Sequence, residues 1–375
     1  MRCRPHVAEL IGAAWARSDE RSGHRRAQAR ATVGALHPRS AELSHMTHSS
    51  DLPRGMTRST PCPRRALVAA SAGMLLGTLA GFLGGLWWAF DLVANLRTQL
   101  TIGLLLTAAA LVMVRLPWMA LVAFVGAAIN LAVVLPFLVG ASTPAPISAD
   151  TETLTVTYFN TKIRSDIPAV VAYLEDRDDD VIALTATTPA WVDALENADL
   201  DLHVVSGTHL VSGLEILVLT RDPFPPIAVH RVTDQKRDTL VEVVIELDGD
   251  PVNLIAAHPV SPRTPLFAQR RDWVLEWLGR WPGHRDNGLV VVGDLNATPW
   301  SAPFDAMLER GGLVDSQRTH GLQPSWPTGA GILGLPVDHV LHSSDLVTLE
   351  RELGPSFGSD HRMVHARLAR RADLD

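Results

Sequence analysis

Polar residues suited to phosphate chemistry recur at the ends of short apolar runs between residues 160 and 361 of this 375-residue chain. Carboxylates and amides bind hard divalent cations, and histidine changes its charge near neutral pH. Hydrolysis of a phosphodiester needs a cation on the phosphate, a base for the attacking water and a donor for the leaving oxygen. The pattern therefore indicates a metal-assisted phosphoesterase site. Its polar residues are Asn160, His258, Asp294, Asn296, Asp338, Asp360 and His361.

The apolar runs beside these residues have the composition of buried strands, and two further segments have the spacing of amphipathic helices. Asp248-Gly249 joins two of the predicted strands, a strong signal for a β-hairpin. Mixed strands, helices and hairpins favour an α/β fold over residues 151–371, in which two stacked sheets are flanked by helices. The predicted strands are 154–159, 180–184, 214–219, 240–247, 252–257 and 289–292, and the predicted helices are 167–175 and 269–278.

In this order the motifs resemble those of the endonuclease/exonuclease/phosphatase superfamily, the metal-dependent phosphoesterases related to pancreatic-type deoxyribonuclease. The family opens with a strand ending in Asn, here Tyr158-Phe159-Asn160. It continues with a Gly-Asp-x-Asn motif, here 293–296, and closes with Ser-Asp-His, here 359–361. The resemblance covers roughly residues 152–370 and implies a deoxyribonuclease-like sandwich. A membrane-anchored bacterial branch of the family is similar in layout.

The resemblance also implies catalytic roles. His361, held by Asp338, would act as the general base or as a phosphate contact. Asp294 would orient or deprotonate the attacking water, and Asn296 would bind the phosphoryl oxygens as charge develops. His258 would contact the phosphate or protonate the leaving oxygen.

The same resemblance implies a cation, Mg²⁺ or Mn²⁺, bound by Asn160, Asp360 and Asp294. One position departs from the family pattern, because Ala186 stands where the family has its main carboxylate ligand, a Glu. A hard cation held by fewer carboxylates binds more weakly, so we expect weak metal binding. Lys162 is an alternative source of positive charge at the cation position, although a solvated lysine is the simpler interpretation.

Three nearly uncharged runs precede the domain, and their lengths predict a three-helix transmembrane anchor over residues 66–140. A cleaved signal peptide is the alternative for the first run, and a buried helical bundle is the alternative for all three. Arg64 and Arg65 before the first run predict a cytoplasmic N-terminus, a multi-pass protein of the cell membrane and an extracytoplasmic domain. Residues 1–65 are expected to be disordered, and residues 141–150 to form a Pro-rich linker. The three runs are Ala66–Phe90, Thr98–Val114 and Leu116–Gly140.

Charge limits the choice of substrate. Residues 150–375 carry a net charge of −15, which disfavours a non-specific nucleic-acid binder. The sequence therefore predicts a membrane-anchored, metal-dependent phosphodiesterase, a class that includes nucleases. A small phosphodiester or a lipid head group fits the charge slightly better than nucleic acid. The alternative is a catalytically impaired module of the same fold that binds phosphate or a partner. No protein partner is inferred.

Overall fold

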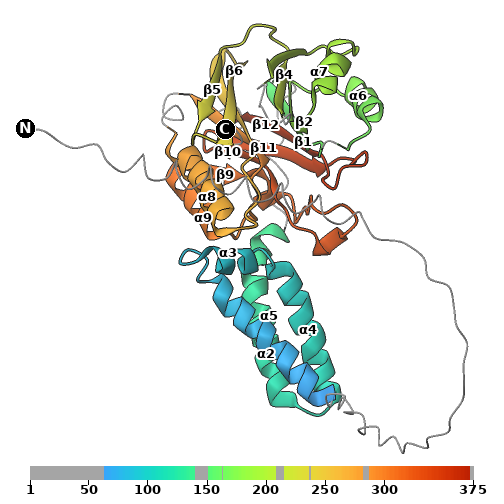
Figure 1. Cartoon of the computed structure of the whole chain (residues 1–375), viewed down its shortest axis with the longest axis vertical. Coiled ribbons are helices and arrows are strands. Elements are labelled where there is room, and N and C mark those ends of the chain that lie inside the picture. Colours follow the sequence, from blue (N-terminus) through green and yellow to red (C-terminus); the bar gives the residue numbers. More distant parts are fainter. Residues whose placement is uncertain are drawn as a thin grey trace, which may run out of the picture. The chain divides into compact units, whose positions relative to one another are not determined.

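The computed structural model describes residues 63–139, 151–162, 164–207, 215–235, 238–281 and 287–371. Its strands form two six-stranded sheets (Figure 1). The first sheet contains β1 (Thr153–Asn160), β2 (Val181–Thr187), β3 (His203–Gly207), β4 (Glu215–Thr220), β11 (Leu346–Leu353) and β12 (Val364–Arg370), in the order β11-β12-β1-β2-β4-β3. The second contains β5 (Ile227–Arg231), β6 (Thr239–Leu247), β7 (Asp250–Ala257), β8 (Gly288–Asp294), β9 (Leu313–Asp315) and β10 (Asp338–Ser343), in the order β5-β6-β7-β8-β10-β9.

One apolar core fills the space between the sheets, and it includes Val156 and Val218 of the first sheet together with Leu254 and Val290 of the second. Two outer cores lie beneath helices. In the first, α6 (Ile167–Glu175) and α7 (Pro189–Glu196) cover the first sheet, and in the second, α8 (Pro265–Arg280) and α9 (Ala302–Gly311) cover the other. The predicted α/β sandwich flanked by helices is confirmed.

The directions of the strands bring the polar residues at their ends close together. β1 and β2 are parallel, as are β7 and β8, so each pair ends at one edge of its own sheet. These two edges meet, because Nδ2 of Asn160 at the end of β1 donates to Oδ2 of Asp294 at the end of β8. β10 runs antiparallel to β8 and begins where β8 ends, with Asp338 opposite Asp294. Gly293 is required here, because a Cβ at this position would lie 2.0 Å from the carbonyl oxygen of Ala257. Close pairing of β7 and β8 thus fixes where Asp294 leaves the sheet.

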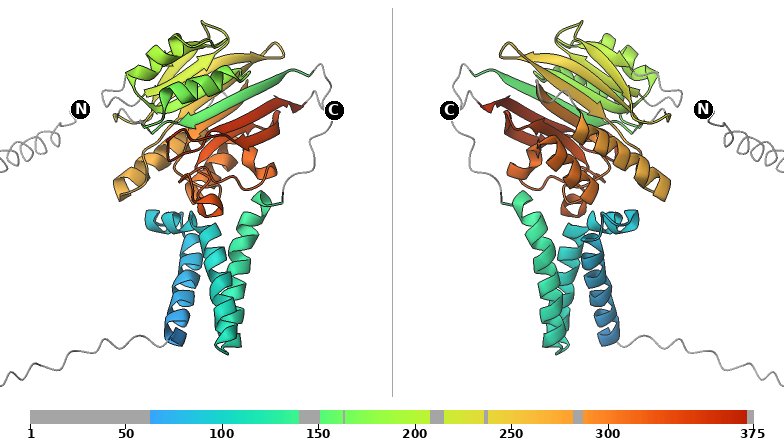
Figure 2. Two further views of the ribbon diagram at one scale, coloured as in Figure 1. Left: turned by 90° about the vertical axis from the view of Figure 1, so that its right-hand side faces the viewer. Right: turned by 90° about the vertical axis from the view of Figure 1, so that its left-hand side faces the viewer.

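The segment before the domain is helical, with α2 (Pro63–Gly81), α3 (Trp88–Ala94), α4 (Arg97–Met113) and α5 (Pro117–Val134). α2, α4 and α5 run side by side and pack through small residues such as Ala108 and Ala123 (Figures 1 and 2). Among the described residues, Pro117–Phe137 is long and apolar enough to cross a membrane. α3 and α4 form a second such segment only if counted as one span, which bends by 62°.

Two boundaries differ from the sequence prediction. Ala66–Phe90 is not one continuous helix, because α2 ends at Gly81 and α3 starts separately at Trp88. The chain packs closely against α3 at this break, since a Cβ at Gly81 or Gly84 would lie 3.2 Å from the Cα of Ala94 or of Asp91, respectively. Residues 63–65, predicted to be disordered, form the first turn of α2. The remaining N-terminal residues, 1–62, and the predicted linker, 141–150, lie outside the described residues.

Candidate active site

Five of the predicted site residues line a cavity of about 560 Å³ at the strand ends, namely Asn160, His258, Asp294, Asn296 and His361. Asp338 and Asp360 lie behind this lining and contact His361. Asp294 contacts three of the other residues. Its Oδ2 accepts a hydrogen bond from Nδ2 of Asn160 (2.9 Å) and lies 3.6 Å from Nε2 of His258 and 3.7 Å from Nε2 of His361. Nδ1 of His361 lies 2.8 Å from Oδ2 of Asp338. Residues separated by up to 201 positions in the sequence therefore form one cluster.

His361 is buried between carboxylates. Burial alone would lower the pKa of its imidazole, but the charges of Asp338 and Asp294 outweigh this effect and raise the pKa to about 9. At neutral pH the ring is thus an imidazolium that donates from both nitrogens. Of the two roles that the resemblance implied for His361, a phosphate contact suits this state better than a general base.

The backbone of Asp294 is held by Tyr158, which was not among the predicted site residues. The backbone N–H of Asp294 donates to the hydroxyl of Tyr158 (2.7 Å), and its Oδ1 accepts from the backbone N–H of Asn296 (3.0 Å). Burial and the charge of Asp338 raise the pKa of the Asp294 carboxyl, while His361 opposes this effect. A carboxylate with a raised pKa is a stronger base, which suits the removal of a proton from water.

His258 and Asn296 complete the cavity wall. Burial lowers the pKa of His258, so at neutral pH it is an uncharged ring, suited to donating a hydrogen bond rather than to protonating a leaving oxygen. Asn296 adopts a left-handed backbone (φ 50°), and its Nδ2 donates to the carbonyl of Pro259 (3.1 Å). Asn296 therefore links the turn after β8 to the turn after β7, while its second amide hydrogen is left for a ligand.

The residues present match a divalent cation in kind but not in number. Asp294, Asp338 and His361 lie close enough for their nitrogen and oxygen atoms to come within 4.8 Å of one another, but the His361 imidazolium has no lone pair to offer, so carboxylates would hold the cation. Oδ1 of Asp338 and Oδ1 of Asp360 are buried without a hydrogen-bond partner among the described residues. Against this, Ala186 lines the cavity with a methyl group and offers no side-chain ligand. A cation would therefore be held by few oxygens, which predicts weak binding.

Asp360 already has a cationic partner. Its Oδ2 lies 3.4 Å from Nζ of Lys162 and accepts a hydrogen bond from Nε1 of Trp326 (3.1 Å). Burial alone would raise the pKa of Asp360, but the Trp326 hydrogen bond and the nearby imidazolium and ammonium lower it. The Lys162 ammonium, which the sequence left as a solvated side chain or a substitute for the cation, thus sits against a predicted metal ligand.

Ala186 has an unusual backbone. Its φ is 58°, and the pairing of β2 with β4 shifts in register around it. A non-glycine residue in the left-handed region is strained, and such strain is concentrated at functional sites. The bulge places Ala186 on the cavity wall rather than in the sheet ladder.

The contacts between the motifs could not be identified from the sequence. Ser359 connects two of them, because its hydroxyl donates to the carbonyl of Asn160 (2.7 Å) and accepts from the N–H of His361 (3.0 Å). His339, although adjacent to Asp338, lies on the other side of its strand against Phe304, with ring centroids 4.4 Å apart. Successive side chains of a strand point to opposite faces of the sheet, so the sequence could have predicted that Asp338 and His339 lie on different sides.

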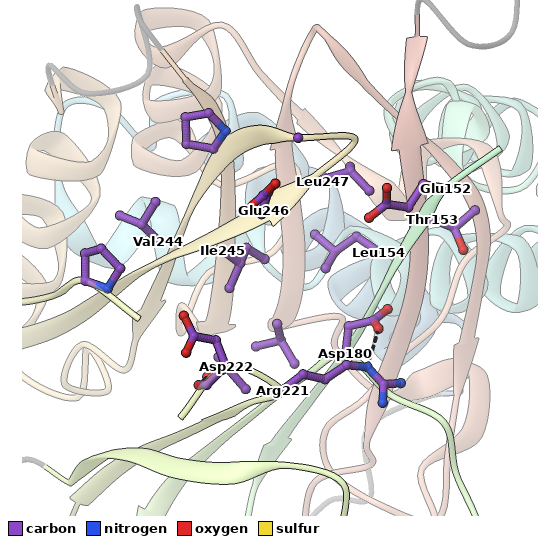
Figure 3. A pocket seen from close by; sticks show the side chains of 15 residues that line it. Glu152, Thr153, Leu154, Asp180, Arg221, Asp222, Val244, Ile245, Glu246 and Leu247 are labelled. Carbon is purple, nitrogen blue, oxygen red and sulfur yellow. Dashed lines mark hydrogen bonds and ion pairs between the residues drawn. The ribbon is translucent and has the colours of Figure 1, made fainter. Parts of the chain in front are cut away.

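A second cavity lies at the opposite end of the sandwich, where β1, β2 and β7 begin (Figure 3). Its most conspicuous group, Arg221, is already paired with Asp180 (2.8 Å) and Asp201 (3.0 Å) and also with Asp178. The Arg221 guanidinium therefore forms ion pairs within the protein rather than facing a ligand. The cavity at the strand ends is therefore the stronger candidate for catalysis.

Comparison with known proteins gives a consistent result. The profile of the Endonuclease/Exonuclease/phosphatase family matches residues 158–361, which include all the predicted site residues. An endonuclease/exonuclease/phosphatase from Bacteroides vulgatus is 14% identical, with a TM-score of 0.50, and the match covers 58% of this chain and 99% of that one. No curated protein matches the sequence.

Two further solved structures are similar at lower scores. A humanized TDP2 from D. rerio is 18% identical over 58% of this chain and 98% of its own, with a TM-score of 0.47. A mannosyl-6-phosphatase from Bacteroides thetaiotaomicron is 13% identical over 58% of this chain and 99% of its own, with a TM-score of 0.46.

Proposed function

Because the chain belongs to the endonuclease/exonuclease/phosphatase family, we propose that it is a membrane-anchored phosphoesterase that hydrolyses a phosphodiester at the Asp294–His361 cluster. The observation that carries this proposal is a cluster at one cavity, in which Asp294, His258 and His361 line the wall and Asp338 and Asp360 contact His361. Family enzymes generally use divalent metals, so the proposed reaction is hydrolysis assisted by a cation.

The proposed proton transfers follow from the charge states. Asp294 accepts a proton from water as the water oxygen attacks phosphorus. The His361 imidazolium and the His258 N–H donate hydrogen bonds to the phosphoryl oxygens as negative charge grows on them. The ester P–O bond breaks, and the departing oxygen recovers a proton from the site or from solvent.

We propose that the cation is Mg²⁺ or Mn²⁺, bound weakly through Asp294, Asp360 and the amide oxygen of Asn160. When bound, it would neutralise charge on the phosphate. The supporting observation is Oδ1 of Asp360, which is buried without a hydrogen-bond partner in the part of the chain that the structure describes, and the limiting one is Ala186. The Lys162 ammonium beside Asp360 opposes cation binding further.

Membrane anchoring is supported by the outward faces of the helices. Large apolar side chains there are open to the surroundings, including Leu106 (67% exposed), Trp118 (79%) and Phe124 (55%). A soluble bundle would place polar residues at such positions. The proposed arrangement is a multi-pass anchor with the N-terminus in the cytoplasm and the domain outside, on the basis of Arg64 and Arg65.

A second candidate function is a phosphate- or partner-binding module without turnover. The Lys162–Asp360 pair favours it, because an ammonium 3.4 Å from a proposed metal ligand attracts phosphate without activating water. The two functions differ in one measurable property, which is release of product.

The test uses the full chain in detergent, with bis(p-nitrophenyl) phosphate as substrate and Mg²⁺, Mn²⁺ or EDTA added. We expect slow hydrolysis that His361→Ala and Asp294→Ala each reduce by about 10²-fold or more. His203→Ala is the matched control, because His203 is exposed on β3, away from the site. Retention of full activity in either site variant, with unchanged circular dichroism, would place the chemistry elsewhere. Phosphate binding without turnover would favour the second candidate.

A further inference from the structure

The active-site cavity has a polar end and an apolar wall. The polar end holds the histidines and carboxylates described above. The apolar wall comes partly from the domain and partly from α3 and the turn after it, which precede the domain in sequence. The apolar residues that line the cavity include Leu92, Leu96, Val260, Phe267, Leu335 and Val337.

Helix α3 is fixed to the domain by buried polar contacts. Asp91 and Arg271 are both 1% exposed, and Oδ2 of Asp91 lies 2.8 Å from Nη2 of Arg271. Oδ1 of Asp91 accepts from the Ser301 hydroxyl (2.8 Å) and the Ala302 N–H (3.0 Å). A buried charge with its partner removed is strongly destabilising, so this pairing favours one fixed position of α3.

A second set of contacts holds the turn after α3. Oδ1 of Asn95 accepts from the backbone N–H (2.9 Å) and the hydroxyl (2.7 Å) of Thr298. Nη1 of Arg271 donates to the carbonyl of Asn296 (3.0 Å), a residue of the cavity itself. The side of the cavity formed by Leu92 and Leu96 is therefore held against the domain by buried contacts. The Arg271 guanidinium connects it to Asn296 at the polar end.

This wall continues into the apolar helices. α4 begins at Arg97, directly after Leu96, and the outward-facing Leu105 and Leu106 follow within three turns. Leu96 is 41% exposed and Phe267 37% exposed, so both line the cavity and also reach its outside. An exposed apolar rim on a cavity marks a site for an apolar ligand or a membrane surface.

We propose that the substrate is a membrane lipid with a phosphodiester head group. Its phosphate would occupy the polar end, and the adjoining glycerol and acyl carbons would lie against Leu92, Leu96 and Phe267. A nucleotide chain fits this wall less well, because its backbone charges would face apolar side chains in a domain of net charge −15. This inference rests on the proposed phosphodiester hydrolysis and adds the substrate class and the residues that select it.

The reaction would consume one water per lipid. The water oxygen bonds to phosphorus, one ester P–O bond breaks, and the released alcohol keeps its oxygen with one proton from the water. No oxidant or second substrate is needed. Either ester bond of the phosphodiester satisfies this balance, and the products report which one breaks.

The test compares lipids that share a head group and differ in chain length. The full chain is reconstituted in detergent micelles with dihexanoyl- or dioleoyl-phosphatidylglycerol, and bis(p-nitrophenyl) phosphate serves as the water-soluble reference. We expect kcat/KM for the dioleoyl lipid to exceed that for the dihexanoyl lipid by about tenfold or more, since each buried methylene contributes to apolar binding.

Two variants test the wall from both sides. Leu96→Ser and Phe267→Ser should each lower the ratio of dioleoyl-lipid to bis(p-nitrophenyl) phosphate kcat/KM by about tenfold. Phe224→Ser is the matched control, because Phe224 is 88% exposed and does not line the cavity, and its ratio should stay unchanged. If Leu96→Ser fails to fold, Phe267→Ser carries the test alone.

The outcomes separate the two proposals. Hydrolysis of bis(p-nitrophenyl) phosphate with no preference for the longer lipid, or with a ratio that neither wall variant changes, overturns the lipid inference and leaves the phosphoesterase in place. Absence of turnover with all three substrates overturns both.

Discussion

The charge state of His361 is the most direct test of the site, and Asp338→Asn is the perturbation that reports on it. Asp338 accepts the Nδ1–H of His361 at 2.8 Å and is the largest of the carboxylate effects that raise the His361 pKa to about 9. The difference from the ordinary value of 6.5 corresponds to about 3 kcal/mol, at about 1.4 kcal/mol per tenfold change in proton affinity. With asparagine at position 338, the pKa should fall by about one unit or more.

The sign of the stability effect follows from the direction of the shift. The pKa of His361 is raised in the folded protein, so its protonation stabilises the fold fully below pH 6.5, and this contribution disappears as pH rises through about 9. The free energy of unfolding should therefore fall across that window, and it should fall less in Asp338→Asn. Loss of the imidazolium should also reduce phosphate binding above pH 9.

The assay is a pH titration of ¹³C-labelled histidine rings by NMR, in EDTA so that no metal contributes. His365 provides an internal control, because burial and the nearby Arg177 charge lower its pKa to about 3, and its resonance should not move between pH 5 and 10. A His361 resonance that titrates at or below 6.5 in the unmodified protein would refute the assignment. So would an Asp338→Asn variant with an unchanged His361 pKa.

Three further predictions concern the cation and the anchor. Ala186→Glu should tighten Mg²⁺ binding by about tenfold or more in calorimetry, because it adds a carboxylate to an incomplete ligand set, and micromolar binding by the unmodified protein would contradict the incomplete-site interpretation. Lys162→Ala should tighten it a few-fold by removing a competing ammonium, with equal affinity as the contrary result. Asp91→Ala should destabilise the protein by about 3–5 kcal/mol in chemical denaturation because Arg271 loses its buried partner, whereas Arg310→Ala, which removes an exposed pair, should cost less than about 1 kcal/mol; equal losses would contradict the buried-pair argument.

Regular periodicity carried much of the fold prediction. The helix predicted over 167–175 has those bounds in the structure, and Asp248-Gly249 connects β6 to β7 with both residues at positive φ. These features are local, because they follow from side-chain spacing and from backbone angles that only certain turn residues adopt readily. The short edge strands β3, β5 and β9 were not predicted, since strands of five, five and three residues give little periodicity to recognise.

The features that could not be predicted from the sequence depend on contacts between residues far apart in the chain. Asp91 lies between two apolar runs with no local partner in the sequence, and it pairs with Arg271, 180 positions away. The same limit applies to the cavity wall, because nothing local connects Leu96 to His361. The predicted convergence of strand ends was possible only because the resemblance supplied the order of motifs. The assignment of individual catalytic roles stays a prediction.

Ala186 and Lys162 act in the same direction, and together they define how this site differs from a strong metal site. Ala186 removes a negative charge that would hold a dication, and the Lys162 ammonium partly neutralises Asp360, which would hold it otherwise. Both changes weaken attraction for a cation and reduce repulsion of a phosphate. His361 adds a further positive charge below pH 9. The site is thereby biased toward binding its anionic substrate before its metal, so the cation should bind more tightly in the presence of a phosphodiester than in its absence.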